Sequence, residues 1–424
     1  MKGLLLGLSF ISLNVWADPT ALTADFKSLL KRYGVGSASD QAYCYQEDNK
    51  VQGYQVDRLQ RIASVTKLFT TYLASETLDL HKRYKTKIFI SGDKMHIQGS
   101  SDPYFEEEKM LLLMQALNDA GYTSFSQVTF DKNLIFSDQA LSAHMDITPS
   151  YTRGRLAAYL NAKNASYVRT KWREISKFAA EEGVDLNASK VPSLTAKTVT
   201  LVEKNPLLTE SPIILEHTSK PLHSILKSMN VMSKNIVAQN VYLESSKIKT
   251  FDTLMKEKGI ASTSFKIYNG SGLPMKGQKR LDNLASCRLV LNIVDALNSS
   301  LKKHNLVLVD VVAINGGEDL GSFRTRFEDY PDTYQAVISK TGTLMHASSL
   351  AGVLLTEKVV PFAILNHTTK VAQSRNFQDN FVARMFHHLG DAVPFDYSKI
   401  SIFPWDNSSF LTEPSLTKIS QRAK

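Results

Sequence analysis

The chain has 424 residues and a formal net charge of +9. It is longer than one typical domain, so two or three domains are expected, and its composition is that of an ordinary globular protein. The sequence contains no dense basic run with interleaved aromatics, which argues against nucleic acid as a partner; a basic surface suits an anionic partner such as a cell wall or lipid headgroups.

The N-terminus is expected to be an export signal that is not part of the fold. Met1 and Lys2 give a short positive start, and Gly3–Leu13 is apolar but too short to span a bilayer. Val15–Ala17 ends in a small residue at the expected cleavage point. We therefore predict a cleaved signal peptide at residues 1–17, with an uncleaved anchor as the alternative. No later apolar stretch is long enough to cross a membrane, so we expect no transmembrane segment in the mature chain.

The first predicted elements are a helix and two paired strands. The helix covers Ala21–Tyr33, and the strands cover Ala42–Gln46 and the stretch around Tyr54. The two cysteines, Cys44 and Cys287, lie in the first strand and in a later helix. A disulfide is possible in an oxidising compartment, but two buried thiols are the expectation. Neither cysteine has a C-x-x-C partner, so a metal or redox role is not indicated.

A second helix is predicted to open at Ser64, within the sequence Ser64-Val65-Thr66-Lys67. Three residues is nearly one helical turn, so Ser64 and Lys67 face the same way. An isolated pair of this kind would be read as a surface serine and a solvated lysine. Together with two later motifs, it matches the S-x-x-K element of active-site serine enzymes.

The pattern changes at about Lys85. Residues Lys87–Gly99 predict a hairpin around a Ser91-Gly92-Asp93 turn, and short strands and helices then alternate up to about residue 220. This stretch carries no catalytic set of its own. We predict an inserted smaller domain at residues 86–221, within a larger domain formed by residues 18–85 and 222–392.

The second motif, Ser233-Lys234-Asn235, lies at a break in helical periodicity. Helical patterns cover Leu222–Met232 and Ile236–Leu243, on either side of the break. Taken alone, these residues would be ordinary helix-cap or loop residues. The break also suits a loop that directs its side chains into a cleft.

The third motif, Lys340-Thr341-Gly342-Thr343, continues a predicted strand that begins at Ala336. Two more strands are predicted at Leu350–Thr356 and Val360–Asn366. A helix is predicted before them within Gln278–Ser300, and a closing helix after them at Ser374–Leu389. Strands bracketed by terminal helices predict an α+β fold, with an antiparallel sheet flanked by helices and a helical cluster carrying the first two motifs. The tail at residues 393–424 is rich in Pro, Ser and Asn and is expected to be loosely ordered.

The motif order S-x-x-K, S-x-N, K-T-G predicts acyl transfer through a serine nucleophile. Ser64 is the predicted nucleophile and Lys67 its general base. A free lysine titrates near 10.4, so the site must lower the pKa of Lys67 by roughly 2–3 units. Lys340, as a second cation in the same cleft, and partial burial would both act in that direction.

The remaining motif residues have predicted roles around that step. Ser233 relays a proton from Lys67 to the leaving amine, and Asn235 holds Lys67 and binds the substrate amide. Lys340 pairs with the terminal carboxylate of the substrate and holds Ser233.

Substrate binding is assigned to the rest of the third motif. Thr341 and Thr343 offer hydroxyls to the substrate carboxylate, and Gly342 lets the substrate lie close to the strand edge. The backbone N–H groups of Ser64 and Thr343 are expected to hold the oxyanion, and one such donor contributes roughly 3–4 kcal/mol to the transition state.

No metal or cofactor is predicted. His96, His223 and His346 are not spaced as ligands, and no H-E-x-x-H motif occurs. The sequence also lacks a Gly-rich phosphate loop before a helix.

These motifs and several further stretches resemble one known family, the class C low-molecular-mass penicillin-binding proteins, which are serine D-alanyl-D-alanine carboxypeptidases/endopeptidases of peptidase family S13. The matching stretches are Ala63–Thr70, Gly99–Pro103, Ser233–Ala238, Tyr268–Leu273, Gly317–Arg326 and Lys340–Gly352. The resemblance runs from about residue 20 to about residue 390.

The resemblance implies a penicillin-binding, β-lactamase-like transpeptidase fold with domains inserted between the first two motifs. It implies cleavage of D-Ala-D-Ala ends, or of the D-Ala to diaminopimelate cross-link, in peptidoglycan stem peptides. It also implies that β-lactams are covalent inhibitors that acylate Ser64, and that the protein works in the periplasm of a Gram-negative bacterium.

Two departures from the family pattern carry expectations. The insertion looks short, so the cleft should be open enough for cross-linked wall to enter. Lys234 replaces an acid, which should make the cleft more basic and could lower the pKa of Lys67 further.

Two other functions remain open. A serine β-lactamase uses the same acylation but must deacylate fast, and the chain has no E-x-x-L-N segment after the first motif and no Tyr-x-Asn second motif. A catalytically silent wall-binding protein on the same fold is the other alternative, and the three intact motifs argue against it.

Overall fold

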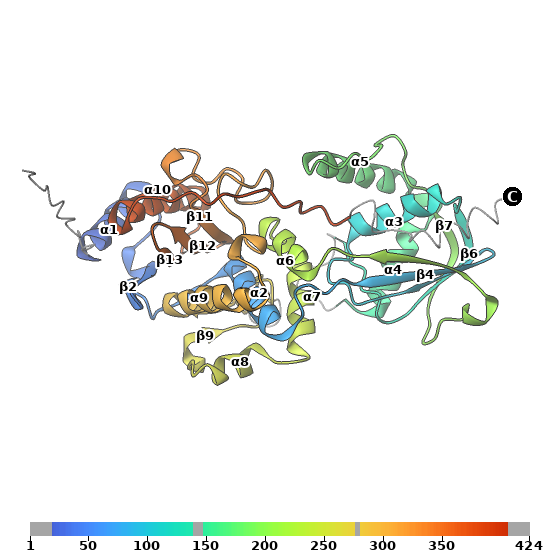
Figure 1. Cartoon of the computed structure of the whole chain (residues 1–424), viewed down its shortest axis with the longest axis horizontal. Coiled ribbons are helices and arrows are strands. Elements are labelled where there is room, and N and C mark those ends of the chain that lie inside the picture. The colour runs from blue at the N-terminus through green and yellow to red at the C-terminus, as the bar shows by residue number, and fades with distance from the viewer. Residues whose placement is uncertain (1–18, 139–146, 276–279, 406–424) are drawn as a thin grey trace, which may run out of the picture.

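The computed structural model describes residues 19–138, 147–275 and 280–405, so the predicted signal peptide lies outside the described residues. Two units lie side by side along the long axis of the molecule, with α6 and α7 where they meet (Figure 1). The first unit contains the N-terminal elements and most of the C-terminal half of the chain. The second unit contains the strands and helices between residues 85 and 218.

A five-stranded antiparallel sheet forms the centre of the first unit. Its order is β11-β12-β13-β1-β2. The strands are β1 (Ala42–Glu47), β2 (Lys50–Tyr54), β11 (Val337–Leu344), β12 (Ala347–Leu355) and β13 (Val359–Asn366). β12 and β13 are buried along nearly their whole length, because helices cover both faces of the sheet.

Alternation along β1 shows how the two faces differ. Tyr43 and Tyr45 pack with α1 and α10, whereas Ala42 and Cys44 pack with α2 and α9. The helices are α1 (Pro19–Tyr33), α2 (Thr66–Thr77), α6 (Leu222–Val231), α7 (Asn235–Ser246), α8 (Phe251–Glu257), α9 (Cys287–Lys303) and α10 (Val371–Leu389). A small sheet of order β3-β10-β9 lies beside them, formed by β3 (Leu59–Arg61), β10 (Leu284–Ser286) and β9 (Phe265–Lys266). The predicted α+β fold with a flanked antiparallel sheet is confirmed.

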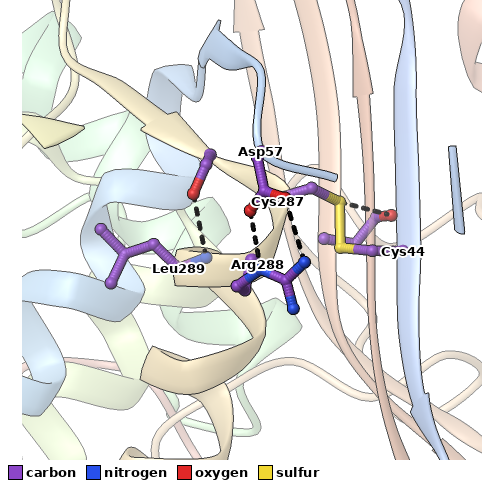
Figure 2. Close-up of a disulfide and its surroundings, with 7 residues drawn as sticks. Cys44, Asp57, Cys287, Arg288 and Leu289 are labelled. Carbon is purple, nitrogen blue, oxygen red and sulfur yellow. Dashed lines mark hydrogen bonds and ion pairs between the residues drawn. A yellow bond between two sulfur atoms is a disulfide. The ribbon is translucent and has the colours of Figure 1, made fainter. Parts of the chain in front are cut away.

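Cys44 and Cys287 form a disulfide, so the expectation of two free buried thiols is wrong. Figure 2 shows the bond joining β1 to the first residue of α9. The two Cα atoms are 6.0 Å apart, within the range that a disulfide spans. Their sequence separation of 243 residues explains why the sequence alone does not reveal the pairing.

The second unit has its own mixed sheet and its own core. The sheet order is β7-β6-β5-β4-β8, with parallel pairs β5/β6 and β6/β7 and antiparallel pairs β4/β5 and β4/β8. The elements are β4 (Lys85–Ser91), β5 (Lys94–Gln98), β6 (Ser124–Phe130), β7 (Thr195–Leu201), β8 (Ile213–Thr218), α3 (Glu107–Asp119), α4 (Pro149–Tyr159) and α5 (Ala165–Glu181). The predicted hairpin is confirmed as β4 and β5. The separate core supports the predicted insertion at residues 86–221, whose bounds stay a prediction.

The segment from residue 393 to 405 packs against both units, so the expectation of a loosely ordered tail is wrong for these residues. Phe403 and Trp405 belong to the core of the second unit, and the Trp405 ring stacks on His217 at a centroid distance of 4.4 Å. Lys220 Nζ donates to the backbone oxygen of Ser401 at 2.9 Å. Apolar residues within this polar tail provide the burial that orders it. Residues 406–424 lie outside the described part.

No helix in the described ranges combines the length and the apolar character that a bilayer span requires.

Candidate active site

Ser64 lies in a tight turn just before α2. Residues Ala63–Val65 form a 3₁₀ turn, and α2 itself begins at Thr66, two residues later than predicted. Ala63 has a φ of 47°, a left-handed conformation that is unusual for a residue other than glycine. The Ser64 side chain is half-buried, so its hydroxyl is held at the start of a rigid helix while remaining accessible.

Two glycines bring other segments against this turn. A Cβ on Gly342 would lie 2.7 Å from Ile62 O and 3.0 Å from Ser64 N. A Cβ on Gly272, whose φ is +81°, would lie 1.9 Å from Ala63 O. The third motif and the Tyr268–Leu273 turn therefore pack directly on the turn that carries Ser64. Position 342 is therefore a glycine because a side chain would collide with the backbone of this turn. The sequence had suggested a different reason, namely room for the substrate.

Lys67 is completely buried, and its amine faces three oxygen atoms. Nζ lies 3.1 Å from Ser64 Oγ, 2.8 Å from Asn235 Oδ1 and 2.8 Å from Ser271 O. A neutral amine has two N–H groups and one lone pair. The amide and backbone oxygens only accept, so they take the two N–H groups and leave the lone pair facing the hydroxyl of Ser64.

Burial and charge both favour that neutral amine. Burial lowers the pKa of Lys67 well below its ordinary value of 10.5, and the charge of Lys340 lowers it further. These are the two causes that the sequence predicted. Lys340 is itself buried, its Nζ donates to Thr341 O at 2.9 Å, and burial lowers its pKa to about 7.

Of the two predicted catalytic residues in the second motif, Asn235 contacts Lys67 and Ser233 does not. Asn235 is the first residue of α7 and binds Lys67 directly. Ser233 lies in the break between α6 and α7 with a φ of 55°. Among the described residues, its hydroxyl has no hydrogen bond to Lys67 or to Lys340, so the predicted contact between Lys340 and Ser233 is not formed here.

Lys234 does not make the cleft basic, contrary to the expectation. Its Nζ lies 2.7 Å from Glu106 Oε2 and 2.8 Å from Glu108 Oε1. Burial would lower the pKa of Lys234, but the two carboxylates outweigh it and hold that pKa well above 10.5. The positive charge is therefore neutralised, and Lys234 is not among the causes that lower the pKa of Lys67.

Two residues that the sequence analysis missed touch the third motif. Ser322 Oγ lies 2.6 Å from Thr341 Oγ1, and Arg375 Nη2 donates to Thr343 Oγ1 at 3.3 Å. Ser322 lies within the Gly317–Arg326 stretch, which could have pointed to it. Arg375 had no comparable signal, because it is one charged residue on a helix 32 positions from Thr343.

The three histidines that were considered as ligands lie among different neighbours. His96 bonds Thr129 Oγ1 at 2.9 Å, and the ring of His223 lies 5.6 Å from that of His81. In residues 19–138, 147–275 and 280–405, no group of three or more His, Cys, Asp or Glu side chains could hold a metal ion.

The fold is similar to that of several solved structures. A predatory peptidoglycan endopeptidase from Bdellovibrio bacteriovorus matches with 24% identity and a TM-score of 0.76, over 88% of this chain and 98% of that chain. The same endopeptidase, acylated by penicillin G and in complex with an immunity protein, matches over the same shares with 24% identity and a TM-score of 0.74. Penicillin binding protein 4 from Haemophilus influenzae matches with 16% identity and a TM-score of 0.56, over 85% of this chain and 99% of that chain.

Sequence comparisons give one family and no curated relative. No curated protein matches the chain. The family described as D-Ala-D-Ala carboxypeptidase 3 (S13) matches residues 44–188 and 194–387, a range that contains all three motifs. The chain therefore belongs to the D-Ala-D-Ala carboxypeptidase 3 (S13) family and is a serine-type D-Ala-D-Ala peptidase, as the three motifs predicted.

Proposed function

We propose that this protein is an exported D-alanyl-D-alanine carboxypeptidase and DD-endopeptidase that acts on peptidoglycan stem peptides through an acyl-enzyme on Ser64. The observation that carries the proposal is the amine of Lys67, which is buried, bound to two acceptor oxygens and 3.1 Å from Ser64 Oγ. This geometry is that of a nucleophile and its general base.

Acylation follows from that arrangement. Lys67 takes the proton of Ser64 as Oγ attacks the carbonyl carbon of the penultimate D-Ala. The backbone N–H groups of Ser64 and Thr343 receive the negative oxygen of the tetrahedral intermediate. Ser233 then relays the proton from Lys67 to the amine of the departing D-Ala, and the C–N bond breaks to leave an ester on Ser64. Water hydrolyses that ester by the reverse proton route.

The substrate carboxylate needs a cation beside the third motif. With a pKa of about 7, Lys340 is only partly protonated at neutral pH in the free enzyme. Arg375 keeps its charge and already donates to Thr343 Oγ1. We assign the carboxylate to the hydroxyls of Thr341 and Thr343, with Arg375 supplying permanent positive charge and Lys340 supplying more when the carboxylate raises its pKa.

Three observations support export and action on the polymeric wall. Residues 1–17 have the sequence pattern typical of a signal peptide, and the Cys44–Cys287 disulfide is typical of an oxidising compartment such as the periplasm. A solved structure of similar fold is a peptidoglycan endopeptidase, and the match covers 98% of the length of that endopeptidase. Another is acylated by penicillin G, which supports inhibition by β-lactams.

Mass spectrometry after exposure to penicillin tests the nucleophile. The protein should gain the mass of one opened β-lactam on the peptide that contains Ser64. The variant Ser64→Ala should lose both this labelling and the release of D-Ala; survival of both would refute Ser64 as the nucleophile. A wild type that neither labels nor releases D-Ala would instead identify a silent wall-binding protein.

Two further assays separate the rival activities. Slow covalent labelling with little nitrocefin turnover is expected for a DD-peptidase, whereas rapid nitrocefin turnover would identify a β-lactamase. Digestion of purified sacculi tests the open cleft: activity on free pentapeptide with none on cross-linked muropeptides would refute the endopeptidase part.

A further inference from the structure

The second motif is attached to the insertion through the side chain of its middle residue. Lys234 Nζ contacts Glu106 and Glu108 at 2.7 and 2.8 Å and lies 4.7 Å from the centre of the Tyr104 ring. The side chains of the three charged residues are only 11–13% exposed. All three partners belong to residues 104–108, at the N-terminal end of α3. One segment of the insertion therefore surrounds the Lys234 ammonium.

That segment is itself held firmly. Asp102 accepts from Lys109 Nζ at 2.5 Å in a fully buried ion pair, and its other oxygen accepts from Tyr104 N at 2.9 Å. Asn240 Nδ2, on α7, donates to Pro103 O at 3.1 Å. The insertion therefore contacts α7 at two places, at the N-terminal end of the helix through Lys234 and along its side through Asn240.

The backbone at the N-terminal end of α7 requires such support. Ser233 has a left-handed φ of 55°, a conformation that is uncommon for a residue other than glycine and costs free energy. Asn235, two residues later, places its Oδ1 2.8 Å from Lys67 Nζ. Lys234 lies between these two residues and is the N-cap of α7, without a capping hydrogen bond from its side chain. Its ammonium is instead directed toward the carboxylates of the insertion.

A role in stability alone does not explain this arrangement. Taking three charged groups out of water is costly, and a buried ion pair is often no more stable than an apolar replacement. The group also carries two carboxylates against one ammonium, so it is not charge-balanced by itself. In some proteins such groups fix one geometry, and the geometry that this one would fix is the start of α7.

We propose that Lys234, held by Glu106 and Glu108, is a positioning residue through which the insertion keeps Asn235 in register with Lys67. The insertion then contributes to catalysis without touching the reacting atoms. This proposal rests on the acyl-enzyme function proposed above.

The test is the acylation rate constant with a fluorescent penicillin, together with kcat and KM on a D-Ala-D-Ala peptide. Lys234→Met should lower acylation and kcat at least tenfold with a smaller change in KM. Asn235, which holds Lys67 and also binds the substrate amide, loses its position, whereas the third motif, which binds the substrate carboxylate, is unchanged. Lys234→Arg, which keeps the charge, should recover a large part of the rate. Glu106→Gln should give an intermediate loss and remains informative if Lys234→Met does not fold.

Two comparisons distinguish positioning from general destabilisation. Glu244→Gln is the matched control: Glu244 lies on α7 at the end far from Asn235, and the change weakens its ion pair with Lys82, outside that helix, so kcat should stay unchanged. In an Asn235→Ala background, Lys234→Met should cost less than twofold, because it acts through the residue already removed. A folded Lys234→Met with the wild-type acylation rate, or a full tenfold loss in both backgrounds, would overturn the proposal. Failure of the wild type to label would instead refute the proposed function.

Discussion

Burial of Lys340 should destabilise the folded protein by an amount that can be worked out. Its pKa falls from 10.5 to about 7, because the folded site disfavours the ammonium. Each pKa unit corresponds to about 1.4 kcal/mol, so the cost at pH 7 is about 4 kcal/mol. Between pH 7 and pH 10.5 the unfolded chain binds more protons at this side chain than the folded one. The contribution of Lys340 to the free energy of unfolding of the wild type therefore rises with pH between pH 7 and pH 10.5.

Replacing Lys340 with methionine removes this cost and abolishes its role in the site. After about 1 kcal/mol is lost with the hydrogen bond to Thr341 O, Lys340→Met should be about 3 kcal/mol more stable than the wild type at pH 7. The gain should disappear near pH 10, and labelling by penicillin should be much slower at every pH.

Urea unfolding at pH 7 and pH 10 measures both parts of this prediction. Lys302→Met, on the exposed side of α9, is the control and should give no pH-dependent gain. A Lys340→Met variant that is no more stable than the wild type at pH 7, or whose gain is the same at both pH values, would refute the reasoning.

Three further outcomes are expected. Arg375→Gln should raise KM for D-Ala-D-Ala peptides about tenfold, because it removes a charged donor worth about 1.5–3 kcal/mol. The control Arg384→Gln, at an exposed position of the same helix, should leave KM unchanged. An equal rise in KM for a peptide with an amidated C-terminus would contradict carboxylate binding. Gly272→Ala should destabilise the protein by about 2–4 kcal/mol and slow labelling, since φ is +81° and no space exists for Cβ; an unchanged melting temperature would contradict this. Replacing Cys44 and Cys287 with alanine should cost about 3–5 kcal/mol in urea unfolding but leave labelling intact at 25 °C, because the bond closes a long loop; a midpoint that does not move would count against it.

Local patterns explain what the sequence predicted correctly. Ser64 and Lys67 are nearly one turn apart, so their contact follows from helix geometry alone. The interruption at Ser233 was visible because helical periodicity stops there and resumes at Ile236. The strand leading into Lys340 was visible as a short apolar run.

Long-range contacts explain what the sequence did not reveal. The charge of Lys234 is cancelled by Glu106 and Glu108, more than 120 positions earlier, so the predicted basic effect on the cleft is absent. Arg375 and Cys287 likewise acquire their partners only when α10 and α9 pack on the sheet. No periodicity in a single chain encodes such pairings.

The path of residues 393–405 has a mechanical consequence. The chain passes between the two units at Tyr84 and returns at Ser219, and these crossings are hydrogen-bonded to each other, which by itself would make a hinge. The C-terminal segment adds a third crossing, where Lys399 bridges Glu182 and Asp319. Three points of attachment make a braced joint, so we expect the two units to move little relative to each other when a substrate binds.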